Sequence, residues 1–482
     1  MAVSDGSIRF RVDGVAVDVV APPHTTVLEW LRSSGRVGTK EGCAEGDCGA
    51  CSVVIVENGA IRAINACIVL LPQIARREIF TVEGLAAPGA RTVADLHPAQ
   101  RAMVEGLGSQ CGYCTPGFVM TVAEATHRTD LDAAWKLDDQ LCGNLCRCTG
   151  YRPIREAAGK VAGCRPDDAI SRALASPAEA DGPVDVALGG ERYVAPDTLR
   201  GVWAALEAPE ARIVCGATDL GLDVTQRHAR FAHLVDLSRV AELRGIRQIP
   251  GGIEIGAATP LTDIEAATAH AMPVLHRMLR YFGSRQIKHR GTIGGNLCTA
   301  SPIGDLAPVM LALDAELVVA SAAGERVVPM DGWFLGYRKT ALRPGEILAA
   351  VRLKAPPPDA RVAAYKVSRR RELDISAVSA AMRVETADGR VTLARFAFGG
   401  MAATTARATA AEALAVGRQW DAGLVEELAA AVAGGFAPMS DHRGTAWYRS
   451  TVAANLVRGF YTETLDAPQT ALPDGHAGTV IA

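Results

Sequence analysis

The sequence lacks the features of an exported or membrane-spanning protein. Residues 1–6 carry no basic cluster followed by an apolar run, so no signal peptide is expected. The early apolar run Ala63–Ala75 contains Asn65, Pro72 and Gln73, and it is too short to cross a bilayer. Twelve cysteines without an export signal favour a reducing compartment, the cytoplasm, and metal ligation rather than disulfide bonds.

An excess of one charge is also absent. The 50 Lys and Arg residues nearly balance 53 Asp and Glu residues, which gives a net charge of −3. This balance argues against nucleic acid or an anionic membrane as the main partner. The hydrophobic content of 49% is typical of a globular protein, and 482 residues exceed what one core serves. Three or four domains are therefore expected.

The chain has no G-x-G-x-x-G motif joining a predicted strand to a predicted helix, so a Rossmann site is not expected. Two other glycine-containing loops are present, Ile213–Gly221 after a short strand and Gly291–Leu297, with Ala300–Leu306 behind the second. Backbone N–H groups in such loops can bind a pyrophosphate. Ordinary turns between strands are the structural alternative.

Cysteines are scarce after residue 182, where only Cys215 and Cys298 occur, but they are concentrated before it. Cys43, Cys48 and Cys51 form a C-x4-C-x2-C pattern interleaved with glycines, and Cys67 is a candidate fourth member. This is the spacing of a plant-type [2Fe–2S] cluster. Glycine suits such a loop because it allows positive φ and lets backbone N–H groups face sulfur. A zinc site fits this spacing less well.

Two cysteine pairs follow in a region with helical patterning. Cys111 and Cys114 precede a predicted helix, and Cys146 and Cys148 precede another. Thiolates at helix N-termini are stabilised by exposed N–H groups, so the two pairs predict a second metal centre. Either a second cluster or a zinc knot is compatible with the residues alone. Cys142 is interpreted as a spare thiol that is not a ligand.

Local patterns indicate mixed secondary structure. A hairpin is expected over Ser7–Val20, and strands over 51–56 and 60–66. Thr115, as N-cap before Pro116, is expected to start a helix. The stretch 165–182 reads as a linker with some helical content. Beyond residue 360, strands at 363–367, 377–384 and 391–398 precede helices at 405–416, 421–433 and 442–461. The run Arg369–Arg371 is expected to be a solvated face, with a contact to a redox site or a partner as the alternative.

With these motifs together, the chain resembles the molybdenum hydroxylase family, and within it the iron–sulfur and flavin subunits of bacterial xanthine dehydrogenases. The resemblance covers almost the whole chain. Its most specific parts are Gly42–Cys51, Gln110–Gly117, Gly143–Ile154 and Thr292–Asp305. The family likeness favours iron–sulfur over zinc at the second cysteine site.

The resemblance implies a set of cofactor-binding residues and no acid or base catalyst in this chain. The implied ligands are Cys43, Cys48, Cys51 and Cys67 for the plant-type cluster, and Cys111, Cys114, Cys146 and Cys148 for the second. The implied FAD contacts are Ile213, Val214, Cys215, Gly216, Ala217, Thr218, Asp219 and Leu220, then Thr292, Ile293, Gly294, Gly295 and Asn296, and also Phe282, Asp305, Leu348 and Lys366. Cys215 and Leu373 depart from the usual family residues. Lys366 is the candidate for tuning the flavin by charge.

The expected architecture is a multidomain α+β protein. A β-grasp [2Fe–2S] ferredoxin domain is expected at 1–84, and a helical-bundle [2Fe–2S] domain at 85–164. After the 165–182 linker, an α+β FAD-binding domain that is not a Rossmann fold is expected at 183–357. A C-terminal α+β flavoprotein domain with a tail is expected at 358–482.

The resemblance further implies a role in electron transfer. Electrons from a molybdenum cofactor on a separate large subunit would pass through two [2Fe–2S] clusters to FAD and then to NAD+, during oxidation of hypoxanthine and xanthine to urate. The expected assembly is a heterotetramer of two small and two large subunits. The alternatives are the corresponding subunit of an aldehyde or carbon monoxide dehydrogenase, and a zinc-stabilised scaffold that is not an enzyme.

Overall fold

The computed structural model describes residues 6–176 and 182–465. Part of the predicted linker, 177–181, and the tail, 466–482, lie outside these residues. The chain forms two compact units: residues up to 242 together with 284–291, and residues 243–283 together with 292 onward.

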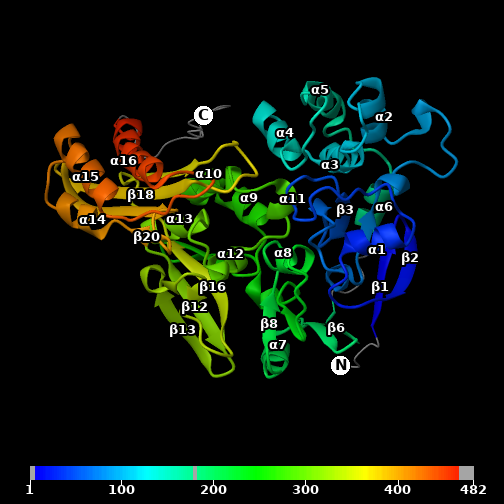
Figure 1. Cartoon of the computed structure of the whole chain (residues 1–482), viewed down its shortest axis with the longest axis horizontal. Helices are drawn as coiled ribbons and strands as arrows, with labels where there is room; N and C mark the ends of the chain where they lie inside the picture. The colour runs from blue at the N-terminus through cyan, green and yellow to red at the C-terminus, as the bar shows by residue number, and fades with distance from the viewer. Residues whose placement is uncertain (1–5, 177–181, 466–482) are drawn as a thin grey trace. The chain divides into compact units, whose positions relative to one another are not determined.

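The first unit begins with a five-stranded sheet of order β2-β1-β5-β3-β4, the β-grasp arrangement that the sequence predicted (Figure 1). The first hairpin turns at Asp13 and Gly14, which both have positive φ. Ile8 and Phe10 are buried, because alternate residues of β1 face the core. Thr26 and Glu29 form a capping box on α1. The elements are β1 Ser7–Val12, β2 Val15–Val20, α1 Val27–Ser33, β3 Ser52–Glu57, β4 Ala60–Asn65 and β5 Glu78–Phe80.

A helical part follows, with α3 lying against β3 (Figure 1). The predicted cap of α3 was wrong by one residue. Cys114 is the N-cap, already with helical φ and ψ, so Pro116 is not the first helical residue. The Thr115 hydroxyl is instead hydrogen-bonded to the Ser109 hydroxyl at 2.7 Å. The helices are α2 Pro98–Glu105, α3 Thr115–His127, α4 Ala134–Leu141, α5 Arg152–Val161 and, within the predicted linker, α6 Ala169–Ala175.

The first unit ends with a four-stranded sheet of order β6-β7-β9-β8, in which β9 runs parallel to both neighbours. Its elements are β6 Val184–Leu188, β7 Glu191–Ala195, α7 Leu199–Leu206, β8 Ala211–Val214, α8 Leu220–Thr225 and β9 His233–Asp236. The short helix α11, Arg285–Lys288, also belongs to this unit although it is distant in sequence.

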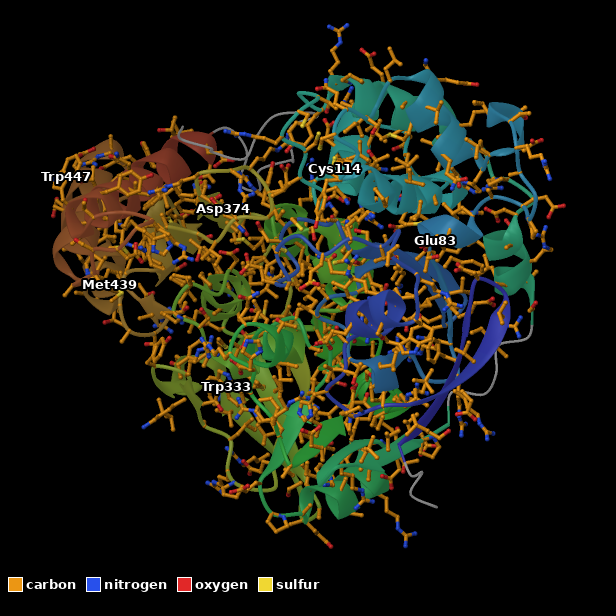
Figure 2. All side chains as sticks on the ribbon, turned by 45° about the vertical axis from the view of Figure 1, so that its right-hand side comes forward. Glu83, Cys114, Trp333, Asp374, Met439 and Trp447 are labelled. Carbon is orange, nitrogen blue, oxygen red and sulfur yellow. The ribbon has the colours of Figure 1, made fainter. Side chains whose placement is uncertain are left out.

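The second unit contains a five-stranded antiparallel sheet of order β10-β11-β16-β12-β13. Trp333 is fully buried in its core, and its indole N–H donates to the Leu297 carbonyl at 3.0 Å (Figure 2). The elements are β10 Ile246–Ile249, β11 Gly252–Gly256, α9 Leu261–Ala271, α10 Pro273–Arg280, α12 Ile293–Thr299, α13 Leu306–Ala312, β12 Glu316–Ser321, β13 Gly324–Pro329, β14 Phe334–Gly336, β15 Lys339–Thr340 and β16 Ile347–Lys354.

A second sheet in this unit, of order β17-β18-β19-β20, packs against C-terminal helices. The helix predicted from Thr405 begins later, because Ala406 and Arg407 pair with β19 as strand β20. Trp447 on α16 is 75% exposed (Figure 2). The elements are β17 Arg361–Val367, β18 Val378–Ala387, β19 Arg390–Gly399, β20 Ala406–Arg407, α14 Thr409–Ala415, α15 Ala422–Gly434 and α16 Ala446–Glu463.

Among the helices of residues 6–176 and 182–465, none combines the length and the apolar character that crossing a membrane requires.

Candidate cofactor sites

The first four predicted cysteines converge in the ferredoxin-like part. Cys43 and Cys48 lie in the loop between α1 and β3, Cys51 directly precedes β3, and Cys67 follows β4. The thiols of Cys48 and Cys67 hydrogen-bond to Cys43 and hold the pKa of the Cys43 thiol far below its usual range. Contacts with Cys43 and Cys51, together with burial, raise the pKa of Cys67. Four sulfur atoms therefore share one site.

The loop around these thiols has the geometry that a negatively charged cluster needs. The backbone N–H of Cys48 donates to Cys43 Sγ at 3.3 Å, and that of Glu45 donates to the same sulfur at 3.5 Å. Gly46 and Gly49 have positive φ. A side chain at Gly42 would place its Cβ 2.7 Å from Cys48 Sγ. Donors aimed at sulfur and a tight glycine loop fit a [2Fe–2S] cluster.

The second set of predicted cysteines converges between two helix starts of the helical part. Cys111 and Cys114 precede α3, and Cys146 and Cys148 precede α5; Figure 2 marks Cys114. Burial and a hydrogen bond with Cys146 raise the pKa of Cys114 to about 12. A hydrogen bond with Cys111 raises the pKa of Cys148. These contacts join the two pairs, as expected for one shared metal centre.

The environment of Cys146 favours its thiolate. Burial alone would raise its pKa, but the hydroxyl and backbone N–H of Thr149, with further N–H groups, lower it. Its own backbone N–H donates to the Tyr151 hydroxyl at 3.0 Å. Cys142 lies at the C-cap of α4. A thiolate in the second site fits both an iron–sulfur cluster and zinc by chemistry alone.

The first predicted FAD loop, Ile213–Leu220, is the turn between β8 and α8. Ala217 has a φ of 61° there. A Cβ on Gly216 would lie 1.9 Å from the Arg290 carbonyl, so only glycine allows this close backbone approach. The Gln73 amide donates to the Cys215 carbonyl at 3.0 Å. The Cys215 backbone therefore takes part in holding the turn.

The second predicted FAD loop is helical, in contrast to the loop expected from its glycines. Thr292 caps α12, and its hydroxyl accepts from the Gly295 N–H at 3.0 Å. A Cβ on Gly294 would lie 2.7 Å from the Ala257 carbonyl, so glycine is required for packing rather than for a turn. Asn296 Oδ1 is buried and accepts no hydrogen bond from any residue the structure describes. An acceptor of this kind fits a ligand hydroxyl, such as those of the FAD ribityl chain.

The remaining predicted FAD positions lie in the second unit. Lys366 Nζ contacts Asp305 Oδ2 at 2.9 Å, and the Ser376 hydroxyl donates to Asp305 Oδ1 at 2.5 Å. The Lys366 charge is therefore paired with a buried carboxylate. Phe282 packs against the core of the unit, and Leu348 is buried in β16. Ser376 carried no sequence signal, because its contact depends on the fold of the loop after β17.

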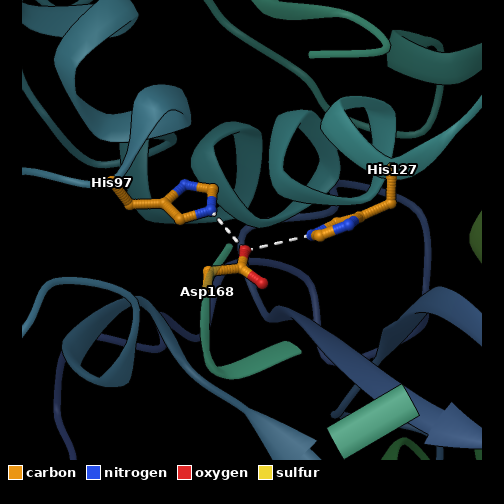
Figure 3. Close-up of side chains that lie close together, drawn as sticks. All are labelled: His97, His127 and Asp168. Atoms are coloured by element: carbon orange, nitrogen blue, oxygen red, sulfur yellow. Dashed lines mark hydrogen bonds and ion pairs between the residues drawn. The ribbon is translucent and has the colours of Figure 1, made fainter. Parts of the chain in front are cut away.

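A cluster that the sequence did not indicate joins His97, His127 and Asp168 (Figure 3). Asp168 Oδ2 lies 2.8 Å from His97 Nε2 and 3.0 Å from His127 Nε2. Burial alone would raise the pKa of Asp168, but hydrogen bonds from both histidines and the Ser171 N–H lower it well below its usual range. The cluster attaches α6 to the start of α2 and the end of α3.

The tautomer of His97 argues against a metal ion in this cluster. His97 Nδ1 accepts the Ala99 backbone N–H at 3.1 Å, so the proton of neutral His97 is on Nε2 and is donated to Asp168. A histidine that binds a metal through Nε2 instead donates its Nδ1–H to an acceptor. The arrangement is therefore a hydrogen-bonded attachment of the linker helix.

Family profiles match four successive parts of the chain. They are a 2Fe-2S iron-sulfur cluster binding domain at residues 10–71, a [2Fe-2S] binding domain at 81–159, an FAD binding domain in molybdopterin dehydrogenase at 187–356, and a CO dehydrogenase flavoprotein C-terminal domain at 363–464. The first two profiles cover the two cysteine sites in order, and the third covers both predicted FAD loops.

Curated relatives include xanthine dehydrogenases. The protein from Emericella nidulans is 33% identical over 96% of this chain and 39% of its own length. That from Drosophila subobscura is 34% identical over 88% of this chain and 36% of its own length. The xanthine dehydrogenase/oxidase of Mus musculus is 30% identical over 97% of this chain and 40% of its own length. This chain thus spans about two fifths of the length of these relatives.

Solved structures give a consistent assignment. One chain of a Cu,Mo-CO dehydrogenase is 29% identical, with a TM-score of 0.53, over 55% of this chain and 94% of its own length. One chain of quinoline 2-oxidoreductase from Pseudomonas putida 86 is 28% identical, with a TM-score of 0.54, over 57% of this chain and 97% of its own length. Together with the four ordered domains, these matches show that the chain belongs to the molybdenum hydroxylase family, as its iron–sulfur and FAD-binding part.

Proposed function

We propose that this chain is the iron–sulfur and FAD subunit of an NAD-dependent xanthine dehydrogenase. The observation that carries the proposal is the convergence of eight cysteines into two groups of four within the unit that also holds the first FAD segment. The likeness to xanthine dehydrogenases over nearly the whole chain supports the substrate class, hypoxanthine and xanthine.

The chain's own residues would hold the cofactors and tune them. When bound, the two clusters would carry single electrons and FAD would accept two and reduce NAD+. Backbone N–H groups directed at Cys43 stabilise negative charge at the first site. Asn296 Oδ1 is available to a ligand hydroxyl at the second FAD segment.

The contacts of α8 support a position for the plant-type site next to the flavin. This helix begins at the end of the first FAD loop, and its C-cap residue Gln226 donates to the Cys43 carbonyl at 3.0 Å. A Cβ on Gly221 would lie 2.8 Å from the carbonyl of Ile68, the residue after Cys67. We therefore propose the order helical-part cluster, plant-type cluster, FAD.

We propose further that the molybdenum cofactor and the purine site are on a separate large subunit, in a heterotetramer of two small and two large subunits located in the cytoplasm. The xanthine dehydrogenase relatives are much longer than the part of them that this chain matches, which supports a catalytic part outside the matched residues. The matched CO dehydrogenase chain corresponds to only 55% of this chain, which supports distribution of these domains over several chains within the family.

A subunit of a carbon monoxide or aldehyde dehydrogenase is the second candidate. The likeness of the flavin-binding part to CO dehydrogenase structures favours it. The fusion of cluster and flavin parts through the 165–182 linker favours the xanthine type, because the matched CO dehydrogenase chain lacks a counterpart of almost half of this chain.

Co-purification with the native partner would distinguish these functions. We expect a brown complex that reduces NAD+ with xanthine or hypoxanthine, and no reduction with carbon monoxide or an aldehyde. Turnover of carbon monoxide or an aldehyde but not of xanthine would reassign the substrate. A colourless protein that contains stoichiometric zinc would overturn the electron-transfer function itself.

A further inference from the structure

We propose that Gln286 is a positioning residue that fixes the two cysteine loops relative to each other and thereby sets the coupling between the two clusters. This inference rests on the proposed cluster ligands. It concerns a residue that lies in the FAD-binding profile and was not expected from the cysteine motifs.

Asn144 forms a side-chain bridge between the loops. It lies two residues before Cys146 and is 2% exposed. Its Nδ2 donates to the carbonyl of Gly49, which lies between Cys48 and Cys51, at 2.9 Å. Its Oδ1 accepts from the Thr121 hydroxyl on α3 at 2.7 Å. The orientation of one amide therefore fixes one loop against the other.

Gln286 holds that amide in place. Its Nε2 donates to Asn144 Oδ1 at 2.9 Å and lies 3.4 Å from the Ser52 hydroxyl at the start of β3. Gln286 is 1% exposed, so these contacts are made away from solvent. Deep burial makes it costly to leave the Nε2 donor unpaired, and this cost favours a single arrangement.

The other end of the Gln286 amide defines a close contact with the second loop. Its Oε1 accepts no hydrogen bond from the described residues. A Cβ on Gly143 would lie 2.0 Å from this oxygen. Gly143 directly precedes Asn144. The Gln286 amide therefore packs against the backbone of the second loop and is hydrogen-bonded to the Asn144 side chain, which in turn contacts the first loop.

The helix that carries Gln286 is held firmly in the first unit. Lys288 Nζ contacts Asp139 on α4 at 3.1 Å. His289 Nδ1 donates to the Ala63 carbonyl on β4 at 2.7 Å. Arg290 pairs with Glu57 on β3 at 3.2 Å. Because α11 and the residues that follow it contact both the sheet and the helical part, Gln286 is held at a fixed position between them.

The test replaces Gln286 with methionine, which has similar length but cannot donate to Asn144. Gln100→Met is the matched control, because Gln100 caps α2 through the His97 N–H and donates to Val82, away from both loops. Full-length protein with both clusters is reduced with dithionite, and the magnetic splitting between the clusters is measured by low-temperature paramagnetic resonance, with the two reduction potentials and the midpoint of thermal unfolding.

We expect Gln286→Met to retain two distinct cluster signals with a shifted splitting, and Gln100→Met to retain the wild-type splitting at a comparable loss of thermal stability. Gln286→Asn, which is too short to reach Asn144, should shift the splitting in the same way. If neither Gln286 variant binds iron while Gln100→Met does, the proposal is also supported, because the loops then depend on this amide.

Wild-type splitting in loaded Gln286→Met or Gln286→Asn protein would overturn the positioning role and leave the cluster assignment intact. The same shift in Gln100→Met would also overturn it, because general destabilisation would then be the cause. Absence of two signals in the wild-type protein would instead overturn the proposed cluster ligands.

Discussion

The backbone N–H of Leu145 donates a hydrogen bond of 3.0 Å to the carbonyl of Cys48. Leu145 directly precedes Cys146, so this hydrogen bond connects a proposed ligand of one site to the residue next to a proposed ligand of the other. The Tyr113 hydroxyl makes a second connection, to the Glu41 carbonyl. The two sites are therefore parts of one bonded framework, which suits single-electron transfer between them.

Removal of one cysteine should abolish one site and spare the other. We expect Cys51→Ala to eliminate the plant-type signal and Cys148→Ala to eliminate the other, with about half of the iron lost in each case, because each binuclear cluster needs four ligands. Iron analysis and paramagnetic resonance of the reduced protein would measure both effects. Cys142→Ala is the control and should retain both signals. Loss of a signal in this control would show that Cys142 is a ligand.

Gly49→Ala should destabilise the first unit strongly. Gly49 has a φ of 68°, and an added Cβ would lie 2.2 Å from the Gly143 carbonyl. The left-handed conformation alone costs a side chain roughly 1–2 kcal/mol, and the backbone clash adds to that cost. Urea unfolding of the loaded protein would measure the change.

Gly59→Ala provides the matched control for this prediction. Gly59 has a φ of 71°, but no atom lies within 4 Å of the added Cβ. We expect the free energy of unfolding of this variant to fall only by the cost of the left-handed backbone conformation, roughly 1–2 kcal/mol. Equal losses in the two variants would mean that the contact between Gly49 and the second loop does not limit stability.

The sequence predicted the features that depend on local spacing. The first hairpin and the turn after β8 have the predicted positions, because short-range patterns determine which loops and strands form. The cysteines of each predicted group also lie in contact with one another. The contact between Asn144 and Gln286 joins residues 142 positions apart. An isolated amide has no periodicity, so only the packing of α11 reveals this partner.

Two local predictions failed for reasons that are also tertiary. The segment Thr292–Asn296 contains two glycines, which suggested a loop, but it forms a helix in which Gly294 packs closely against Ala257. The cap of α3 is Cys114 rather than Thr115, whose hydroxyl is hydrogen-bonded to the Ser109 hydroxyl. Intrinsic preference is a weak guide at positions where contacts of this kind compete with it.

Lys366→Met should destabilise the second unit by about 3–5 kcal/mol, because it leaves the buried Asp305 carboxylate without its cation. Chemical denaturation would measure this loss. The double variant Lys366→Met with Asp305→Asn removes both charges and should recover much of the stability. The double variant also separates the effect of charge from that of packing. If the flavin reduction potential shifts in the single variant and regains its wild-type value in the double variant, the unpaired charge caused the shift. An unchanged potential and NADH formation in Lys366→Met would remove the proposed role in tuning the flavin.

His289 should make the first unit sensitive to acid. Burial, opposed by the charge of Glu124, lowers the pKa of His289 to about 3 from its ordinary 6.5. Between these values the unfolded chain binds a proton that the folded chain does not, so stability falls as the pH decreases from 6.5 towards 3. The extra slope is at most about 1.4 kcal/mol per pH unit for one proton.

The variant His289→Asn has no group at this position that titrates in this range, and Asn can still donate to the Ala63 carbonyl. The stability of this variant should therefore depend less steeply on pH. Urea unfolding between pH 6.5 and 5.5 would measure both slopes above the range where Glu124 and Asp139 contribute, because their pKa values are lowered from 4.5 and 3.8 and affect stability only once the unfolded carboxyls bind protons. Parallel slopes would show that His289 is already protonated in the folded protein, and the hydrogen bond from Arg285 to its Nε2 would then be misassigned.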